Sequence, residues 1–447
     1  MSDGARAERL IELDHWLTGC RQRSQLKVTP IDWQACTGWQ VSAQGIEHRT
    51  GGFFSLRGRS SEAVAGVAPA YAQPMIDQPE IGILGFVLRQ GPVGFEWLLQ
   101  AKTEPGNELG TQLAPSVQAT ESNYKRRHNG AATPLLELFL APGKHQVLSD
   151  TLGSEQGSRF IGKYNRNMSV LLTTAIDDDL GPNLRWCPSQ VLQLLLLRDF
   201  VLNTDARSSL FIADWRTLSR AAHPFADVQS AFGKALQRSF AAQAPDLAQT
   251  LGWLTELRGR PRPTPLGMAL AALDNWTFNE HGLQSSGDAQ YRISAFAVST
   301  TDREVDAWCQ PLVSGHRANL AILYCQEQQG VLRFLLRASW ELGFMEGFQL
   351  GPSWQSDAMG YQALAIADLR RDSRIKIVCQ IQQSDEGGRF INSICRYQIR
   401  QLPNGLPIPD DLHYRWLTLA DIHAMRPLKG LLTNEARSVL SMLLAWL

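Results

Sequence analysis

The chain repeats itself, and this repetition constrains its fold more than any other feature of the sequence. Residues 104–118 and 341–355 share the pattern E-x-G-x3-G-x-Q-L-x-P-S-x-Q, and the two segments start 237 residues apart. Further along the shift becomes 230, because Arg159-Phe160-Ile161 aligns with Arg389-Phe390-Ile391, so the second copy is seven residues shorter. Matches of this length in the same order indicate a tandem duplication.

We assign residues 1–215 to the first repeat and residues 216–447 to the second. In the first repeat an apolar run, Ile81–Leu88, is followed by a Gly/Pro turn and by the alternating segment Phe95–Ala101. This pattern is typical of a β-hairpin, because alternate residues of a strand face the same side of the sheet. Residues 320–338 show the same pattern in the second repeat.

Each repeat ends with apolar residues at helical spacing, Val191–Phe200 and Ala206–Leu210 in the first copy. Asn203 or Thr204 is the expected N-cap of the last helix, because both side chains can accept from exposed N–H groups. We therefore predict an α+β fold made of two tandem domains. The Pro-rich stretch 258–265 is the candidate linker or surface connection.

Composition excludes several classes of protein. Lys+Arg 43 and Asp+Glu 43 balance to a net charge of zero, which argues against a nucleic-acid partner bound mainly through phosphates. The longest apolar stretch, Val191–Leu197, is too short to span a membrane, and the charged start of the chain does not resemble a signal peptide. The seven cysteines contain no CxxC pair, so we expect a reducing, cytoplasmic location and no disulfide framework.

The segment that follows the first hairpin is rich in neutral donors and acceptors. Such side chains suit a polyhydroxy ligand, because each hydroxyl needs both a donor and an acceptor. An ordinary polar surface loop is the alternative interpretation. The candidate residues are Lys102, Glu104, Asn107, Gln112, Ser116, Gln118, Thr120, Ser122, Asn123 and Tyr124.

The second copy serves as an internal control for these residues. Glycine, leucine and proline positions persist across the shift, whereas many polar positions do not. The polar positions that change are His48 (Ser285), Lys102 (Ser339), Asn107 (Phe344), Thr120 (Asp357), Asn123 (Gly360), Lys163 (Ser393), Asn165 (Cys395) and Asn167 (Tyr397). We therefore predict that the first repeat is catalytic and that the second has a degenerate pocket with a structural or dimerisation role.

A group of cations follows in the first repeat. Arg159, Lys163 and Arg166 lie within eight residues, together with Asn165 and Asn167. Arginine binds phosphate oxygens in bidentate fashion and lysine binds them as a point charge, so this cluster suits a diphosphate. A solvated strand with salt bridges is the alternative. The nine histidines are scattered, and no metal site is predicted.

Four strings carry a family resemblance: residues 51–55 (GGFFS), 104–124, 156–168 and 203–208 (NTDARS). Together they resemble the NDP-hexose 2,3-dehydratases, over essentially the whole chain. The resemblance implies two Nudix-like domains, a homodimer, and a lyase (hydro-lyase) that acts on a dTDP-linked 4-keto-6-deoxyglucose in deoxysugar and antibiotic biosynthesis. It further implies that the product passes to a 3-ketoreductase or an aminotransferase. The chain lacks the Nudix box, in keeping with an enzyme that needs neither metal nor cofactor.

The implied reaction needs a base for the C3 hydrogen, an acid for the departing C2 hydroxyl, and donors for the C4 oxyanion. Glu104, Tyr124 and His48 are the candidates for acid and base, and their roles stay open. Lys102, Asn107 and Asn123 are candidates for the oxyanion, and Arg159, Lys163 and Arg166 for the diphosphate. A nucleotide-sugar binding protein without turnover and a Nudix-type pyrophosphohydrolase are the alternative functions.

Overall fold

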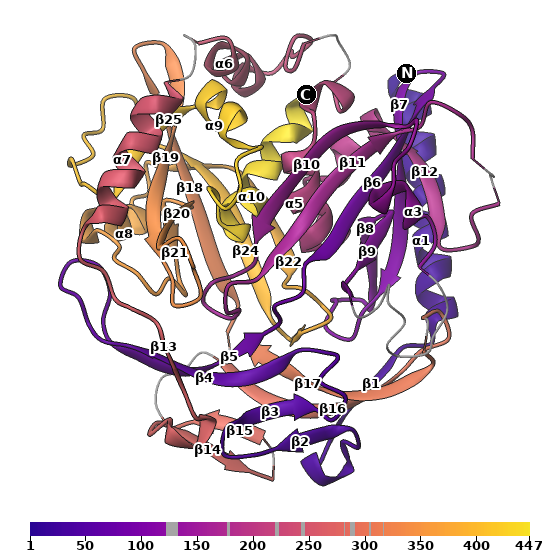
Figure 1. The fold of residues 1–447 in the computed structure, drawn as a ribbon. Coiled ribbons are helices and arrows are strands. Elements are labelled where there is room, and N and C mark those ends of the chain that lie inside the picture. Colours follow the sequence, from indigo (N-terminus) through magenta and orange to yellow (C-terminus); the bar gives the residue numbers. More distant parts are fainter. Residues whose placement is uncertain are drawn as a thin grey trace.

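A computed structural model describes residues 1–121, 133–176, 179–219, 223–242, 246–280, 282–286, 291–303, 305–315 and 317–447 of the chain. Two large sheets, one from each half of the sequence, stand side by side in the upper part of the molecule (Figure 1). A smaller β unit, built from both halves, lies below them. The architecture therefore contains two similar lobes and one shared region.

The two large sheets have equivalent topologies. The first has the order β10-β11-β6-β7-β12, with β8 on β7 and β9 on β6. The second has the corresponding order β22-β24-β18-β19-β25, with β20 on β19 and β21 on β18. The strands of the first sheet are β6 (Gly82–Gly91), β7 (Gly94–Thr103), β8 (Thr111–Pro115), β9 (Val117–Ala119), β10 (Gln146–Ser154), β11 (Tyr164–Leu171) and β12 (Leu184–Pro188). Those of the second are β18 (Asn319–Gln328), β19 (Val331–Trp340), β20 (Phe348–Gly351), β21 (Trp354–Gln355), β22 (Lys376–Ser384), β24 (Ile394–Gln401) and β25 (Tyr414–Thr418).

Details of strand register repeat as well. Each sheet has one parallel pair, β6 with β11 and β18 with β24, among antiparallel neighbours. An irregularity in the register falls between Val147 and Ser149 in one sheet and between Ile377 and Cys379 in the other, 230 residues later. Both expected hairpins are confirmed, because β6 pairs with β7 and β18 pairs with β19 in antiparallel register.

The lower unit joins the two halves by exchanging strands. Its first sheet has the order β13-β4-β3-β2, with β5 on β4, and its second has β14-β15-β16-β17-β23, with β1 on β16. Thus β1 of the first half pairs with the second half, and β13 of the second half pairs with the first. The bounds are β1 (Lys27–Ile31), β2 (Trp39–Val41), β3 (Gly45–His48), β4 (Ser55–Ser61), β5 (Tyr71–Asp77), β13 (Leu266–Met268), β14 (Trp276–Asn279), β15 (Gly282–Ser285), β16 (Tyr291–Ser299), β17 (Ala307–Gly315) and β23 (Phe390–Ile391).

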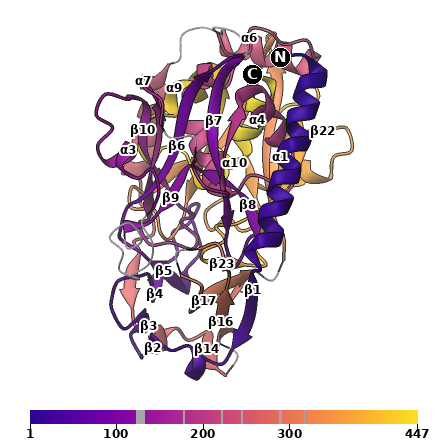
Figure 2. The same ribbon diagram turned by 90° about the vertical axis from the view of Figure 1, so that its right-hand side faces the viewer.

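Helices cover the sheets and fill the space between them. Helix α1 runs along the first sheet beside β7 and β8 (Figure 2), and α5 packs against its counterpart α10. The α-helices are α1 (Asp3–Ser24), α3 (Glu137–Leu140), α4 (Ser189–Leu195), α5 (Thr204–Ile212), α6 (Ala231–Phe240), α7 (Leu247–Gly259), α8 (Leu364–Asp368), α9 (Leu419–Met425) and α10 (Asn434–Ser441). Short 3-10 helices are η1 (Trp33–Ala35), η2 (Trp215–Thr217), η3 (Leu270–Ala272), η4 (Leu369–Arg371) and η5 (Met442–Trp446).

Local capping and anchoring agree with the sequence patterns. Asn203 is the N-cap of α5, and its side-chain oxygen accepts from the Ala206 N–H at 2.8 Å, as expected. The two matched tryptophans anchor matched helices: Trp16 Nε1 donates to the Pro182 carbonyl at 2.9 Å, and Trp253 Nε1 to the Leu412 carbonyl at 2.8 Å. The duplicated sequence thus specifies duplicated contacts as well as duplicated strands.

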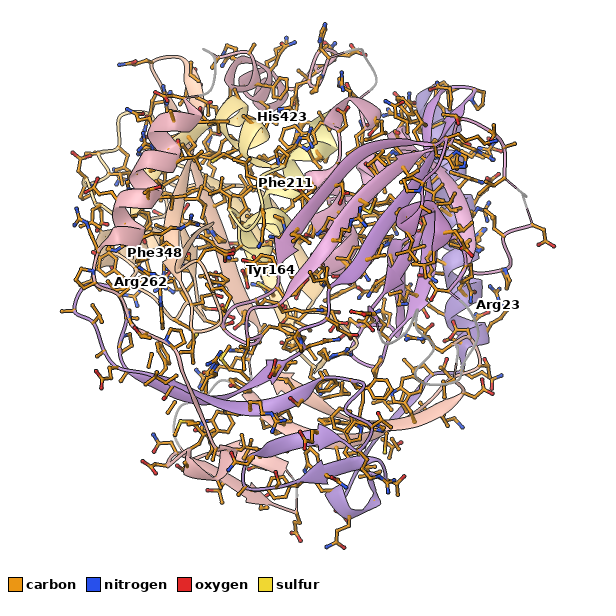
Figure 3. The ribbon with its side chains drawn as sticks, in the orientation of Figure 1. Arg23, Tyr164, Phe211, Arg262, Phe348 and His423 are labelled. Atoms are coloured by element: carbon orange, nitrogen blue, oxygen red, sulfur yellow. The ribbon has the colours of Figure 1, made fainter. Side chains whose placement is uncertain are left out.

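The main core lies between the two sheets and is shared by both halves. Trp215 has its ring 5.8 Å from that of Phe211 and 4.8 Å from that of His423, and both of these residues lie in the upper middle of the molecule (Figure 3). Tyr164, near the centre, donates its hydroxyl to a carboxyl oxygen of Glu346 in the other half. Among the described residues, no helix is long and apolar enough to cross a membrane.

Candidate active site

A cavity of about 270 Å³ lies between the first large sheet and the lower β unit. Residues of both repeats line it, because the lower unit contains strands from both halves. Seven of the predicted site residues are in its lining: His48, Lys102, Glu104, Gln118, Thr120, Lys163 and Asn165. The cavity is therefore the candidate active site of the first repeat.

Glu104 is the centre of a hydrogen-bonded network in this cavity. It follows the end of β7, and its two carboxyl oxygens accept from Gln118 Nε2 at 3.0 Å and from Asn107 Nδ2 at 3.4 Å. The Gln118 amide oxygen in turn accepts from Asn203 Nδ2 at 2.8 Å, so the cap of α5 holds the glutamine in place. Both carboxyl oxygens of Glu104 are therefore held in place by amide donors.

Lys102 brings a positive charge to the same buried network. It lies on β7, it is buried, and its Nζ donates to the backbone oxygen of Gln118 at 3.0 Å. The turn after Glu104 is fixed against the second repeat, because Gly106 N–H donates to the Gly387 carbonyl at 2.9 Å. A side chain at position 106 would collide with the backbone of Phe390, so this close approach requires glycine.

The loop before β23, in the second repeat, completes this wall of the cavity. Glu386 Oε1 accepts from the Gly388 N–H at 3.1 Å, while Oε2 is buried and has no hydrogen-bond partner among the described residues. Burial raises the pKa of the Glu386 carboxyl to about 7, against the opposing effect of Arg389. The Arg389 guanidinium lies over the Phe54 ring, with its Cζ 4.5 Å from the ring centroid.

A third group of polar residues lines the cavity beside β11 and α5. Glu155 accepts from Asn165 Nδ2 at 2.8 Å and from Asn434 Nδ2 at 3.0 Å, and Lys163 Nζ donates to the Glu80 carbonyl. Burial is the main cause of the raised pKa of Glu155 and of the lowered pKa of Lys163. Burial likewise raises the pKa of Asp205, which lies in the first turn of α5.

The remaining wall is aromatic. His48 lies edge-on to Trp39 and Phe53, with ring centroids 5.5 and 4.8 Å away, and its Nδ1 is 2.8 Å from Thr50 Oγ1. Burial lowers the pKa of the imidazole, which favours the neutral form of His48. Trp308 of the second repeat also lines the cavity. This wall can stack on a planar ring such as a nucleobase.

The sequence profile of the NDP-hexose 2,3-dehydratases matches residues 10–212 and 247–443, which is most of the chain and includes both repeats. The chain belongs to the NDP-hexose 2,3-dehydratase family.

Three relatives of this dehydratase carry the name dTDP-4-dehydro-6-deoxy-alpha-D-glucopyranose 2,3-dehydratase. The protein from Saccharopolyspora spinosa is 29% identical over 97% of this chain and 90% of its own length. The protein from Amycolatopsis orientalis is 28% identical over 95% of this chain and 88% of its own length. The protein from Streptomyces violaceoruber is 30% identical over 95% of this chain and 94% of its own length.

Several predicted site residues of this dehydratase lie outside the cavity lining and support the fold. Ser116 links two strands, since its Oγ accepts from the Val87 N–H at 2.9 Å and donates to the Leu98 carbonyl at 2.6 Å. Gln112 Nε2 donates to Ser384 Oγ at 3.1 Å and so connects the two repeats. Asn107 acts on the cavity indirectly, through its hydrogen bond to Glu104.

The predicted diphosphate cations are distributed differently from our expectation. Arg166 is bound to Asp150 by two hydrogen bonds of 2.8 and 2.6 Å, away from the cavity, so it matches the salt-bridge alternative. Asn167 accepts from Ser209 Oγ at 2.9 Å and is also absent from the lining. Of the three predicted cations only Lys163 lines the cavity.

Arg159 points toward the other repeat, and its counterpart Arg389 takes its place in the cavity. The Arg159 guanidinium lies 4.3 Å from the ring centroid of Tyr291, which occupies the position equivalent to Phe54. Each arginine thus lies against a ring of the other repeat, just as β1 and β13 each pair with a strand of the other repeat. The shift of 230 residues pairs Arg159 with Arg389, and it is the only signal in the sequence that could have pointed to the second arginine.

Three predicted residues, Ser122, Asn123 and Tyr124, lie outside the described residues. The cavity also contains residues that were not among the predicted site residues. These are chiefly the carboxyl groups of Glu155, Asp205 and Glu386, the guanidinium groups of Arg303 and Arg389, and the rings of Trp39, Phe53 and Trp308. Within the described part of the chain, no three His, Cys, Asp or Glu side chains are grouped so that they could hold a metal ion.

Proposed function

We propose that the protein is a hydro-lyase that converts dTDP-4-keto-6-deoxy-D-glucose into dTDP-3,4-diketo-2,6-dideoxy-D-glucose, and that the reaction takes place in the cavity of the first repeat. The observation that carries this proposal is the presence in one cavity of Glu104, held by two amide donors, and of the buried cation Lys102, which donates to the backbone oxygen of Gln118. A carboxylate and an ammonium group are what proton abstraction beside a ketone requires.

The chemistry begins at C3, where the neighbouring ketone acidifies the hydrogen. In our proposal the Glu104 carboxylate takes the C3 proton, and the electron pair of the C–H bond forms an enolate whose charge rests on the C4 oxygen. Lys102 stabilises this charge, because a buried cation interacts more strongly with it than a solvated one does. The C2 hydroxyl then leaves as water, and the resulting enol tautomerises to the diketone.

The loss of water leaves the sugar at the same overall oxidation level, so this reaction requires no redox cofactor. We assign the thymine base to the aromatic wall of Trp39, Phe53 and Trp308, where stacking is available. The diphosphate is assigned to Arg389 and Arg303, since guanidinium groups bind phosphate oxygens well. Lys163 lies among the carboxyl groups and is assigned to the hexose.

The test is turnover of the purified protein with the 4-keto sugar nucleotide, coupled to a 3-ketoreductase and NADPH that trap the labile product. We expect NADPH consumption that depends on the enzyme, and release of free dTDP when the reductase is omitted. Binding without turnover would favour a nucleotide-sugar binding protein. Mg²⁺-dependent release of a nucleoside monophosphate would favour a pyrophosphohydrolase of the Nudix type.

The family resemblance also motivates three accompanying proposals: a Nudix-like fold for each repeat, a homodimeric enzyme, and a cytoplasmic location in which the product passes to a 3-ketoreductase or an aminotransferase. The dimer is tested by sedimentation of the purified chain, for which we expect twice the mass of 49.7 kDa.

A further inference from the structure

Glu386 is a carboxyl group of the second repeat that lies in the cavity of the first. Its Oε1 accepts one backbone N–H, from Gly388 at 3.1 Å. Its Oε2 is buried, and the described residues provide no hydrogen-bond partner for it. A buried carboxyl oxygen without a partner is costly for a fold, so a ligand that supplies the partner is expected there.

The carboxyl groups of Glu386 and Glu104 lie close to each other. A Cβ atom placed on Gly388 would lie 2.5 Å from Glu386 Oε1 and 3.7 Å from Glu104 Oε1, so both oxygens are near one point of the cavity wall. Their hydrogen bonds differ in kind and number. Glu104 has an amide donor on each oxygen, whereas Glu386 has one donor, the Gly388 N–H, among the described residues.

The environment of Glu386 favours the protonated form of its carboxyl group. The pKa of Glu386 is raised to about 7 by burial and by the negative charges of Glu104 and Glu155, so this group holds its proton more readily than an ordinary glutamate. A carboxyl group that holds its proton beside a second carboxyl group is a usual arrangement of an acid and a base in one active site. The charged groups that face Glu386 are Glu104, Glu155, Lys163, Asp205 and Arg389.

We propose that Glu386, supplied by the second repeat, is the general acid that protonates the departing C2 hydroxyl in the first-repeat site. This inference rests on the proposed dehydration and on Glu104 as its base. The O–H bond of Glu386 breaks, its proton goes to the C2 oxygen, and the C2–O bond breaks to release water. The enol O–H proton then returns to Glu386 while the proton on Glu104 goes to C2, which restores both groups.

The duplication supplies a natural comparison for this role. The residue equivalent to Glu386 in the first repeat is Gln156. It donates to Asp385 Oδ1 at 3.2 Å, in the polar cluster beside Glu341 that is the second-repeat counterpart of the residues around Glu104 (the second cluster). An amide cannot deliver a proton in this way, so the second cluster lacks the proposed acid. The substitution Glu386→Gln therefore gives the active cavity the residue that the chain already carries at the equivalent position.

The deciding experiment separates loss of the C3 proton from loss of the C2 hydroxyl. The 4-keto sugar nucleotide is incubated in D₂O with wild type, Glu386→Gln or Glu104→Gln, and both C3 deuterium incorporation and dehydration are followed by NMR. For Glu386→Gln we expect dehydration to fall at least about 100-fold while C3 exchange stays within about threefold of wild type. For Glu104→Gln we expect both to be lost.

The pH dependence gives a second readout. A general acid must be protonated, so wild-type kcat should fall as the pH rises through about 7, and Glu386→Asp should retain this limb at a lower rate. Glu386→Gln should lack it. Two results with a folded Glu386→Gln protein would overturn the proposal. One is a dehydration rate within threefold of the wild-type rate, and the other is the loss of both C3 exchange and dehydration. Absence of dehydration in wild type would instead refute the proposed function.

Discussion

The polar cluster around Glu104 and its counterpart around Glu341 differ in how their carboxyl groups are satisfied. Both oxygens of Glu104 accept amide donors, whereas neither oxygen of Glu341 has a hydrogen-bond partner within the described structure. The reason is visible in the sequence: Phe344 replaces the donor Asn107, and the amide of Gln355 is itself unpartnered where Gln118 is held by Asn203. The same fold thus satisfies the hydrogen bonds of the carboxyl group in the first repeat and, among the described residues, leaves those of its counterpart in the second repeat unsatisfied.

The two clusters also differ in cations. Ser339 and Ser393 stand where the first repeat has Lys102 and Lys163, and Ser393 Oγ donates to Asp385 at 2.5 Å. The second cluster keeps its carboxyl groups, and burial raises the pKa of Asp385 to about 6 and of Glu435 to about 7. The comparison indicates that the two lysines and the amide network, together with the proposed acid Glu386, distinguish the cavity of the first repeat from the second cluster.

The largest contrast is expected between Glu104→Gln and its match Glu341→Gln. Loss of the proposed base Glu104 should lower kcat by roughly 1,000-fold, whereas Glu341→Gln should stay within about twofold of wild type. Steady-state assays of both proteins with the coupled reductase measure this. An equal loss of kcat in the two variants would mean that both clusters contribute to catalysis, which would contradict the assignment of catalysis to the first-repeat cavity.

Lys102→Met and Ser339→Ala test the cation. Removing the charge that we propose stabilises the oxyanion should lower kcat by about 100-fold with a smaller effect on KM, because the proposed interaction strengthens in the transition state. Ser339→Ala should change neither constant appreciably. If Lys102→Met raised only KM, the lysine would bind the ground state, and its assignment to the oxyanion would be wrong.

Arg389→Ala and Arg159→Ala test the exchange of arginines between the repeats. Arg389 lines the cavity, so its loss should raise KM by about tenfold, while loss of Arg159 should raise it less than threefold. Titration of dTDP by calorimetry gives an independent affinity for each variant. The reverse order would show that the sequence-based assignment of Arg159 was right and that the cavity is misassigned.

The smallest effect concerns stability in the second cluster. The folded-state pKa of Glu435 lies above its ordinary value, so its contribution to stability is present at low pH and is lost as the pH rises toward and through about 7. Glu435→Gln cannot undergo this loss, and at pH 8 it should gain about 1 to 3 kcal/mol relative to wild type, but not at pH 4. Thermal unfolding at both pH values measures the gain, with the exposed Glu137→Gln as control. A difference independent of pH would contradict the argument.

Local patterns predicted local structure well. The hairpin of β6 and β7 and the Asn203 cap of α5 follow from alternation and from capping chemistry, which depend on neighbouring residues. The strand exchange was not predictable in this way. Strands β1 and β13 are short, and Pro30 within β1 is tolerated only because β1 lies at a sheet edge.

The site residues show the same contrast between local features, which the sequence predicts, and contacts between the repeats, which it does not. Lys102, Glu104 and Gln118 were found because they lie within one polar segment after the first hairpin; Lys102 is replaced by Ser339 in the second copy, whereas Glu104 and Gln118 persist in both copies. Glu386 and Arg389 were missed because they reach the cavity from the other repeat, and alignment of two copies does not show which copy a side chain faces. Ser116 and Gln112 have the polar chemistry of ligand residues, but their hydrogen bonds are used within the fold.

The most direct test is a structure of the protein with a dTDP-linked 6-deoxyhexose that lacks the 4-keto group and cannot react. We expect the hexose to lie in the first-repeat cavity, with the carboxyl oxygens of Glu104 and Glu386 about 3 to 4 Å from C3 and from the C2 hydroxyl. A hexose bound beside Glu341, or one remote from both Glu104 and Lys102, would contradict the account.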